Sequence, residues 1–307
     1  MRVFENANYA FIANRRKAYI FSLIVTLLGF ASFFTQGFEW GIDFTGGKEY
    51  VVRTTVDRPV GDIRADVDRT LGGAPEVKRY GEDLLVRVGP DVEGNATEVG
   101  EKIVAAVGNG ASVAGYDEIA PRFATDLQRA ALYAVLASVI VIFFYVLVRF
   151  EWTAGVGAIV SLVHDVLFTL SLFSLLHGWL PFSLAIDQTI VAAFLTIVGY
   201  SINDTVVVFD RIREDQLKWK NMPIEEVSNK AMNETLSRTI ITGGATLLSL
   251  AVVFLFGGEA VRGFAFAMLV GILLGTYSSV FIATPVMVDV QRYLARRGNK
   301  RFKTQVA

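Results

Sequence analysis

The chain has 307 residues, of which 53% are hydrophobic, and a formal net charge of −1. It contains no cysteine and two histidines, which excludes disulfides and thiol catalysis and leaves too few ligands for a typical zinc site. The phosphate-binding pattern GxxxxGK[ST] is absent, so nothing predicts ATP hydrolysis. We therefore expect neither an enzyme nor a protein that binds a metal, a cofactor or nucleic acid. Apolar runs of about 20 residues recur, which is typical of a protein that crosses a lipid bilayer several times.

The first section, residues 1–36, combines a short amino-terminal segment with one apolar run. Residues 1–14 mix apolar and polar positions, as expected of a short helix on the membrane surface. A basic cluster then precedes the apolar run Ala18–Phe34. A cleaved signal peptide is the alternative, but this run exceeds the usual apolar region of about 7–15 residues and no A-x-A site follows it. We expect a retained first membrane span.

Residues 37–126 form a polar, acidic section that predicts a water-soluble domain between the first and second spans. Alternating apolar residues predict strands, and apolar residues three to four apart predict helices. The order strand, helix, strand, strand, helix, strand is that of a ferredoxin-like split βαβ domain, with helices on one face of the sheet. The predicted strands are 48–55, 76–80, 84–88 and 111–119, and the predicted helices are 59–71 and 95–107.

Residues 127–289 carry the remaining apolar runs, and a basic tail follows at 290–307. The charged stretch 211–238 has apolar residues at helical spacing, which indicates an amphipathic helix at the membrane surface. The fold class is therefore an α-helical polytopic membrane protein with six transmembrane helices and a ferredoxin-like α+β domain between spans one and two. Spans two to six are predicted at 127–148, 154–176, 184–209, 239–256 and 264–288.

The distribution of basic residues predicts the orientation. The amino terminus, the loops after spans two and four, and the tail together hold seventeen Lys and Arg, whereas the two short loops on the other side hold only Arg262. By the positive-inside rule, both termini are expected in the cytoplasm. The chain is thus predicted to be a multi-pass protein of the plasma (inner) membrane, with its domain 37–126 periplasmic or extracellular.

The fourth span contains an unusual group of polar residues, within the sequence VGYSINDTVVVFDRIR at 198–213. Asp204 lies roughly 9 Å inside the end of the apolar run at Asp210, at 1.5 Å per residue. A carboxylate at such depth costs about 3 kcal/mol unless it is neutralised or paired, and intramembrane carboxylates generally have a function. Arg238, at the start of the next apolar run, is the expected partner of Asp204.

The fifth span carries Thr and Ser residues three and four positions apart, which predicts one polar stripe. Simpler interpretations of these polar residues exist. The hydroxyls can serve only to join helices, the Asp204–Arg238 pair can be purely structural, and Arg238 can be only an anchor of the span at the membrane surface. In the third span, His164 and Asp165 are adjacent and predict a buried polar network, although a lone buried histidine is common. Asp187 is expected to cap the outer end of the fourth span, and residues 210–215 to form a solvated cytoplasmic face.

A proton site is the functional interpretation of these residues. Burial disfavours the charged form of a carboxylate, and a nearby guanidinium favours it. Movement of Arg238 away from Asp204 would therefore switch this carboxylate between proton-binding and proton-releasing forms. One proton that crosses about 150 mV releases roughly 3.5 kcal/mol, enough to bias a two-state motion. The predicted proton-pathway residues are Asp204, Arg238, Asn203, Ser201, Thr205, Thr239, Thr242, His164 and Asp165.

Four sequence elements resemble the SecF branch of the SecD/SecF family, in the resistance-nodulation-division superfamily. They are WGIDFTGG at 40–47, His164-Asp165, VGYSINDTVVVFDRIRE at 198–214 and LSRTIITGGATLLSL at 236–250. The resemblance covers essentially the whole chain. Gly243 stands where the family commonly has Ser.

The resemblance implies a half-unit of that superfamily's architecture and a SecD partner for the other half. It implies a proton-motive-force-coupled accessory subunit of the Sec translocase that assists preprotein translocation and release across the plasma membrane. The expected partners are SecD, the SecYEG translocon, YajC, YidC, unfolded preproteins and the lipid bilayer. The alternatives are half of a proton-driven small-molecule or lipid exporter, for which the outer domain looks small, and a non-transporting assembly subunit.

Overall fold

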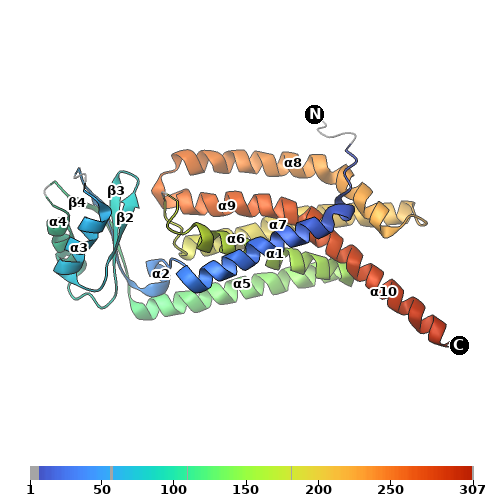
Figure 1. Cartoon of the computed structure of the whole chain (residues 1–307), viewed down its shortest axis with the longest axis horizontal. Coiled ribbons are helices and arrows are strands. Elements are labelled where there is room, and N and C mark those ends of the chain that lie inside the picture. Colours follow the sequence, from blue (N-terminus) through green and yellow to red (C-terminus); the bar gives the residue numbers. More distant parts are fainter. Residues whose placement is uncertain (1–6, 56–57, 109, 181, 306–307) are drawn as a thin grey trace.

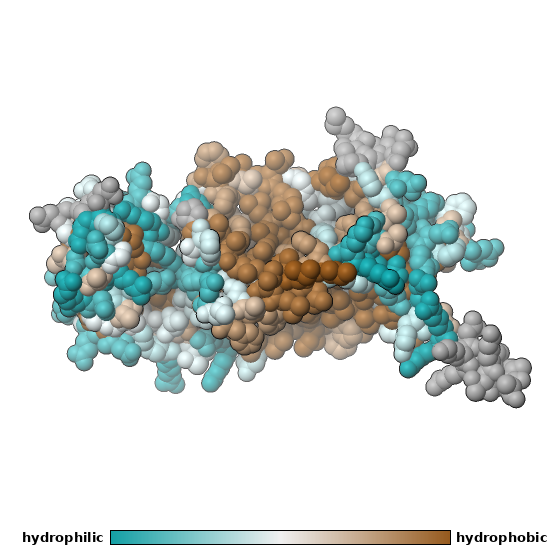
Figure 2. Space-filling model, in the orientation of Figure 1, coloured by the Kyte–Doolittle hydropathy of each residue, from teal (hydrophilic) through white to brown (hydrophobic). Residues whose placement is uncertain are grey.

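The computed structural model describes residues 7–55, 58–108, 110–180 and 182–305, with side chains described up to residue 297. Figure 1 shows a long bundle of helices that carries a small α/β domain at one end. The last helix extends away from the bundle at the opposite end. A broad hydrophobic band covers the bundle between two hydrophilic ends in Figure 2, as expected of a protein that spans a membrane.

Six helical stretches in the described part of the chain are long and apolar enough to cross a membrane. The predicted number of spans is therefore confirmed. The first five are α1 (Phe11–Gln36), α5 (Pro121–Arg149), α6 (Trp152–Leu176), α7 (Gln188–Lys218) and α8 (Ile224–Phe256). The sixth comprises α9 (Glu259–Ser278), a π-helical turn η1 (Ser279–Ala283) and the first part of α10 (Thr284–Gln305).

Helix boundaries differ from the prediction at two places. Helix α8 runs unbroken from Ile224 to Phe256, so the separate interfacial helix predicted within 211–238 is wrong. Pro223 precedes the helix and acidic residues occupy its first turn, both of which favour a helix start, and no proline interrupts it before Phe256. The first span likewise begins at Phe11 and continues through the basic cluster, and residues 1–6 of the predicted surface helix lie outside the described residues.

Helix α7 begins with the cap that was predicted at Asp187. The side chain of Asp187 accepts a hydrogen bond from the backbone N–H of Ile190 at 2.8 Å, which is the geometry of a helix N-cap. At the other end of α7, Asp215 is fully buried rather than solvated, and Arg211 lies 3.7 Å from it. The predicted solvated face is therefore wrong at Asp215, because α8 packs against this end of α7.

The α/β domain has the predicted order of strands and helices. A short helix α2 (Ile42–Thr45) links α1 to the domain. The four strands are antiparallel and lie in the order β2-β3-β1-β4. The core of the domain lies between one face of this sheet and the two longer helices, and it includes the fully buried side chains of Tyr50, Val86, Ile63 and Ile103. We interpret this order as ferredoxin-like. The elements are β1 (Gly47–Arg53), α3 (Val60–Leu71), β2 (Glu76–Tyr80), β3 (Asp83–Val88), α4 (Ala96–Val107) and β4 (Ser112–Ile119).

The other face of the sheet joins the domain to the helical bundle through Glu39. This carboxylate has only 7% of its side chain exposed, and it accepts hydrogen bonds from Arg87 at 2.8 Å, from Ser183 at 2.9 Å and from Lys78. His177 Nδ1 lies 3.2 Å from its second oxygen. Lys78 and Arg87 belong to β2 and β3, whereas Ser183 and His177 belong to the loop between α6 and α7. The domain is therefore attached by a buried ionic joint, which we call the Glu39 joint.

Candidate functional site

Asp204 lies inside the bundle on α7, with 3% of its surface exposed. The Thr276 hydroxyl, on α9, donates a hydrogen bond to its carboxylate at 3.3 Å. Ser201 and Thr205 are also buried on α7, and the Thr205 hydroxyl donates to the carbonyl of Ser201. Asn203 is exposed and points away from this group. The structure therefore brings Asp204, Ser201 and Thr205 to the inner side of α7 and leaves Asn203 outside.

Glycines on α9 allow α7 and α9 to approach closely. A Cβ atom at Gly271 would lie 2.3 Å from side-chain atoms of Ile197, and one at Gly275 would lie 3.0 Å from the Cβ of Ser201. Neither position has room for a side chain without a shift of its neighbour. The small residues thus place the hydroxyls of α9 within reach of the polar residues of α7.

The predicted Asp204–Arg238 ion pair is not formed. Arg238 is exposed on α8, and no ion pair within 4 Å involves it among the described residues. Its carbonyl accepts a hydrogen bond from the Thr242 hydroxyl at 2.9 Å. The pairing prediction is wrong for this structure, because α8 turns a different side toward α7 and α9.

The predicted polar stripe of α8 lies at the edge of the surface that the bundle covers. Thr235, Thr239 and Gly243, spaced four apart, are buried against the bundle. Thr242 and Ser249 are exposed together with Arg238, and the two hydroxyls bond to carbonyls of their own helix. Spacings of three and four place these residues on one side of the helix, but the sequence did not show that the bundle covers only one edge of that side. We call the exposed set Arg238, Thr242 and Ser249 the polar face of α8.

Asp165, on α6, is the centre of a second buried polar group and has no exposed surface. Ser201 donates a hydrogen bond to its Oδ2 at 2.6 Å, and Ser278 donates to the same oxygen at 2.7 Å. His164 Nδ1 lies 2.9 Å from Oδ1. The polar network predicted around the His-Asp dipeptide is therefore confirmed, and it connects α6 with α7 and α9.

The network continues from His164 to the first span. His164 Nε2 lies 2.9 Å from the Ser22 hydroxyl, which lies 3.1 Å from the Tyr277 hydroxyl. The Tyr277 hydroxyl in turn donates to the carbonyl of Ala18 at 3.1 Å. A chain of hydrogen bonds thus leads from the first span through α6 to Asp165.

Chemistry fixes the direction of one bond in this chain. A carbonyl only accepts, so the single proton of Tyr277 points to Ala18. Ser22 has one proton and lies within hydrogen-bond distance of both Tyr277 and Nε2 of His164, so its donor role depends on the tautomer of the ring. Each ring nitrogen of His164 thus faces an oxygen, that of Ser22 on one side and that of Asp165 on the other, as in a chain of groups that can pass a proton.

Four polar residues of this site were missed in the sequence. They are Ser22 on α1 and Thr276, Tyr277 and Ser278 near the end of α9. The run GTYSS at 275–279 was a readable signal, since three hydroxyls and a Tyr interrupt an otherwise apolar span. It also adjoins η1, where the Thr284 hydroxyl donates to the carbonyl of Ser279 at 2.9 Å. π-Helical turns often occur at functional sites.

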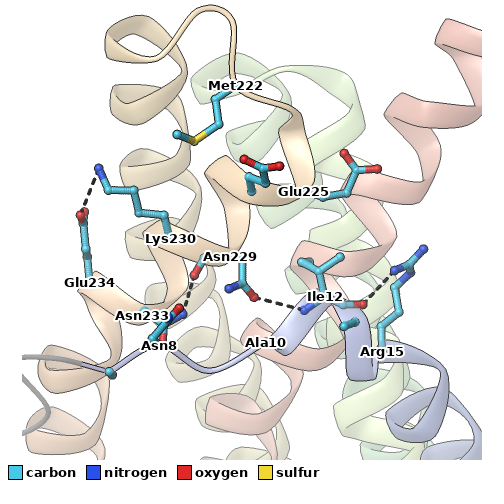
Figure 3. Close-up of a pocket in the computed structure, with 13 residues that line it drawn as sticks. Asn8, Ala10, Ile12, Arg15, Met222, Glu225, Asn229, Lys230, Asn233 and Glu234 are labelled. Atoms are coloured by element: carbon cyan, nitrogen blue, oxygen red, sulfur yellow. Dashed lines mark hydrogen bonds and ion pairs between the residues drawn. The ribbon is translucent and has the colours of Figure 1, made fainter.

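The end of the bundle opposite the α/β domain holds a cleft of about 790 Å³ between the amino-terminal segment and the start of α8 (Figure 3). Asn233 accepts a hydrogen bond from the backbone N–H of Tyr9 at 2.8 Å and donates one to the carbonyl of the same residue at 3.0 Å. One turn earlier, Asn229 accepts from the N–H of Ile12 at 3.4 Å. Two amides of α8 thus hold the chain before α1, so these two helices are fastened together.

Comparison with known proteins places the chain in a family. Residues 99–293 match the family "Protein export membrane protein SecD/SecF, C-terminal", and residues 31–57 match the "SecD/SecF GG Motif". The chain belongs to the SecD/SecF family. It is 54% identical to the protein translocase subunit SecF of Rhodothermus marinus over 97% of this chain and 98% of that protein. It is 39% identical to the SecF subunit of Rhodobacter capsulatus over 83% of this chain and 80% of that protein.

The SecD/SecF fold is also found among solved structures. The crystal structure of SecDF from Thermus thermophilus, a translocon-associated membrane protein, superposes with a TM-score of 0.85 at 33% identity. It covers 95% of this chain but 40% of that one. A structure of SecDF in a super-membrane-facing form gives a TM-score of 0.70 at 32% identity, over 96% of this chain and 40% of that one. The present chain therefore spans less than half the length of these SecDF chains.

Proposed function

We propose that the chain is a proton-motive-force-coupled subunit of a protein translocase, and that it assists the passage and release of preproteins at the outer face of the plasma membrane. The observation that carries the proposal is the buried contact between His164 and Asp165, which is joined through Ser201 to α7. Asp204 lies one helical turn further along α7. Two buried carboxylates on one side of the bundle provide sites at which a proton can be taken up and released.

The proposed partner is a SecD-like subunit that covers the polar face of α8. Arg238, Thr242 and Ser249 are exposed on α8, and a guanidinium that faces lipid is costly. A partner span with a carboxylate would neutralise Arg238 and bring the two polar surfaces together. In the proposed cycle, movement of α8 brings Arg238 toward Asp204 and expels its proton, and the reverse movement lets the proton bind again.

The proposed orientation has both termini in the cytoplasm and the α/β domain on the outer side. The excess of basic residues at the bundle end opposite the domain supports this orientation. The Glu39 joint would then transmit motion of the bundle to the outer domain, where a preprotein emerging from a SecYEG-like channel is engaged.

The test is proton-driven preprotein export in vesicles that contain the complex with its partner. Asp204→Asn should leave expression and thermal stability unchanged and abolish the proton-dependent part of export. Asp210→Asn is the matched control on the same helix, because Asp210 pairs with Arg149 at the surface at 2.7 Å. It should export normally. Normal export by Asp204→Asn would refute the proposal.

The Asp204→Asn variant also distinguishes the two alternative functions, an assembly subunit and half of a small-molecule exporter. If the chain were only an assembly subunit, Asp204→Asn would lower copurification with the partner, and export per assembled complex would stay unchanged. If it were half of a small-molecule exporter, the variant would alter drug sensitivity and leave preprotein export intact.

A further inference from the structure

A mostly apolar cavity of about 500 Å³ lies beside the α/β domain, between α2, α5, α6 and α7. Phe38, Trp40 and Phe44 form one wall, and Leu132 and Leu170 contribute from α5 and α6. The first three residues fall within the GG-motif region at 31–57, which also contains Glu39. Part of the GG-motif region therefore lines this cavity.

The wall of the cavity is held rigidly. The N–H of Gly41 donates to the carbonyl of Ile186 at 2.9 Å, and the N–H of Ile186 donates to the carbonyl of Glu39 at 2.7 Å. The side chain of Gln128 donates one of its N–H groups to the carbonyl of Phe44. Thr45 donates to backbone carbonyls in the same way. These two polar side chains of the wall are therefore bonded to the protein itself.

The cavity lies on the side of the bundle away from α8. Figure 1 places α5 and α8 on opposite sides of the bundle. Helix α5 has the smallest buried share of the six spans, 6% of its most apolar window, and it exposes Leu132 and Leu136. It shows no counterpart of the polar face of α8 within the membrane. A surface of this composition faces hydrocarbon, whereas the polar face of α8 requires a protein partner.

An apolar cavity open to hydrocarbon does not stay empty. Water is excluded because it would find too few polar partners there. Empty walls would also lose the dispersion contacts that a filling molecule provides. We propose that this cavity binds an acyl chain of a bilayer lipid, taken from the leaflet next to the α/β domain. The lipid is a resident part of the structure that supports the GG-motif segment, and it is not a transported cargo.

The occupant is tested by a photoreactive benzophenone residue placed at Leu170 in the full chain. The chain is assembled with its partner in nanodiscs of phosphatidylethanolamine and phosphatidylglycerol, then irradiated and analysed by mass spectrometry. The expected product carries the mass of one intact phospholipid. A crosslink to a partner subunit or to a second copy of this chain would overturn the proposal, as would the absence of any adduct.

Blocking variants test the location. Ala131→Trp fills the cavity and should lower the lipid adduct at least tenfold, with Ala131→Phe as the milder substitution if the first does not assemble. Ala134→Trp, on the exposed side of the same helix, should leave the adduct unchanged. An adduct that survives both Ala131 substitutions in assembled protein would mean that the lipid lies outside the cavity, and the proposal would be wrong.

Discussion

Arg87 should be the residue on which docking of the α/β domain most depends. It contacts Glu39 at 2.8 Å and Glu76 at 3.5 Å, it also pairs with Glu49, and only 13% of its side chain is exposed. Lys78 contacts the same Glu39 oxygen. Burial, with a smaller contribution from the Arg87 charge, lowers the pKa of Lys78 to about 7. Arg87 stays charged throughout the neutral range and therefore supplies the permanent charge of the Glu39 joint.

The expected loss of docking free energy differs between substitutions of Arg87 and of Lys78. Removal of one partner from a buried ion pair costs about 3–5 kcal/mol. Glu39 would keep Ser183 and Lys78, so we expect the lower end for Arg87→Met, about 3 kcal/mol, which corresponds to a factor of about 100 in the docking equilibrium. Lys78→Met should cost about 1 kcal/mol at pH 7, because burial already penalises the charge that it removes.

Amide hydrogen exchange at the joint measures this difference. The N–H of Gly41 donates to the carbonyl of Ile186 and the N–H of Ile186 to the carbonyl of Glu39, so the exchange of both groups reports opening of the Glu39 segment that the joint holds in place. Their exchange should become about 100-fold faster in Arg87→Met and less than tenfold faster in Lys78→Met. Equal acceleration in the two variants, or none in Arg87→Met, would refute the reasoning from burial and charge.

Three further predictions concern other contacts. Because docking lowers the pKa of Lys78 to about 7, the undocked state binds more protons above that pH, so protection of the joint should rise roughly fivefold from pH 7 to pH 8 and stay flat in Lys78→Met. Gly157→Ala places a Cβ 2.4 Å from a backbone oxygen of the π-helical turn and should cost about 1–3 kcal/mol in thermal unfolding, whereas Gly199→Ala meets no atom within 4 Å and should be neutral or slightly stabilising. Asn233→Ala removes both bonds to Tyr9 and should increase proteolysis of the amino-terminal segment, while Asn233→Asp, which retains one acceptor, should have a smaller effect.

Much of the fold followed from the sequence because apolar runs of span length have few alternative structures. The six spans and the element order of the α/β domain were predicted from apolar spacing alone. The separate interfacial helix at 211–238 was wrong, since charge along a sequence does not end a helix when no proline or glycine does. The burial of Asp215 was missed for a related reason: a charged residue beyond the apolar run looks solvated until a second helix packs over it.

The site was predicted only in part. The sequence singled out Asp204 and the His164-Asp165 dipeptide, because carboxylates at membrane depth are costly enough to stand out. It did not reveal that Asp165 meets Ser201 and Ser278, since contacts between helices depend on packing order and on small residues such as Gly275. A lone serine in an apolar run gives too weak a signal to be assigned a partner.

Asp165 and Asp204, the two buried carboxylates of the candidate site, differ in how far this chain satisfies them, and that difference supports the proposed partner. Asp165 has three neighbours from the chain itself, His164, Ser201 and Ser278. Asp204 has one hydrogen-bond donor among the described residues, Thr276 at 3.3 Å, although a carboxylate can accept about four. A buried carboxylate with unfilled acceptor positions is either protonated or completed by an outside group. In the proposed cycle that group is Arg238, which is exposed on α8 and is brought to Asp204 by movement of this helix under a docked partner.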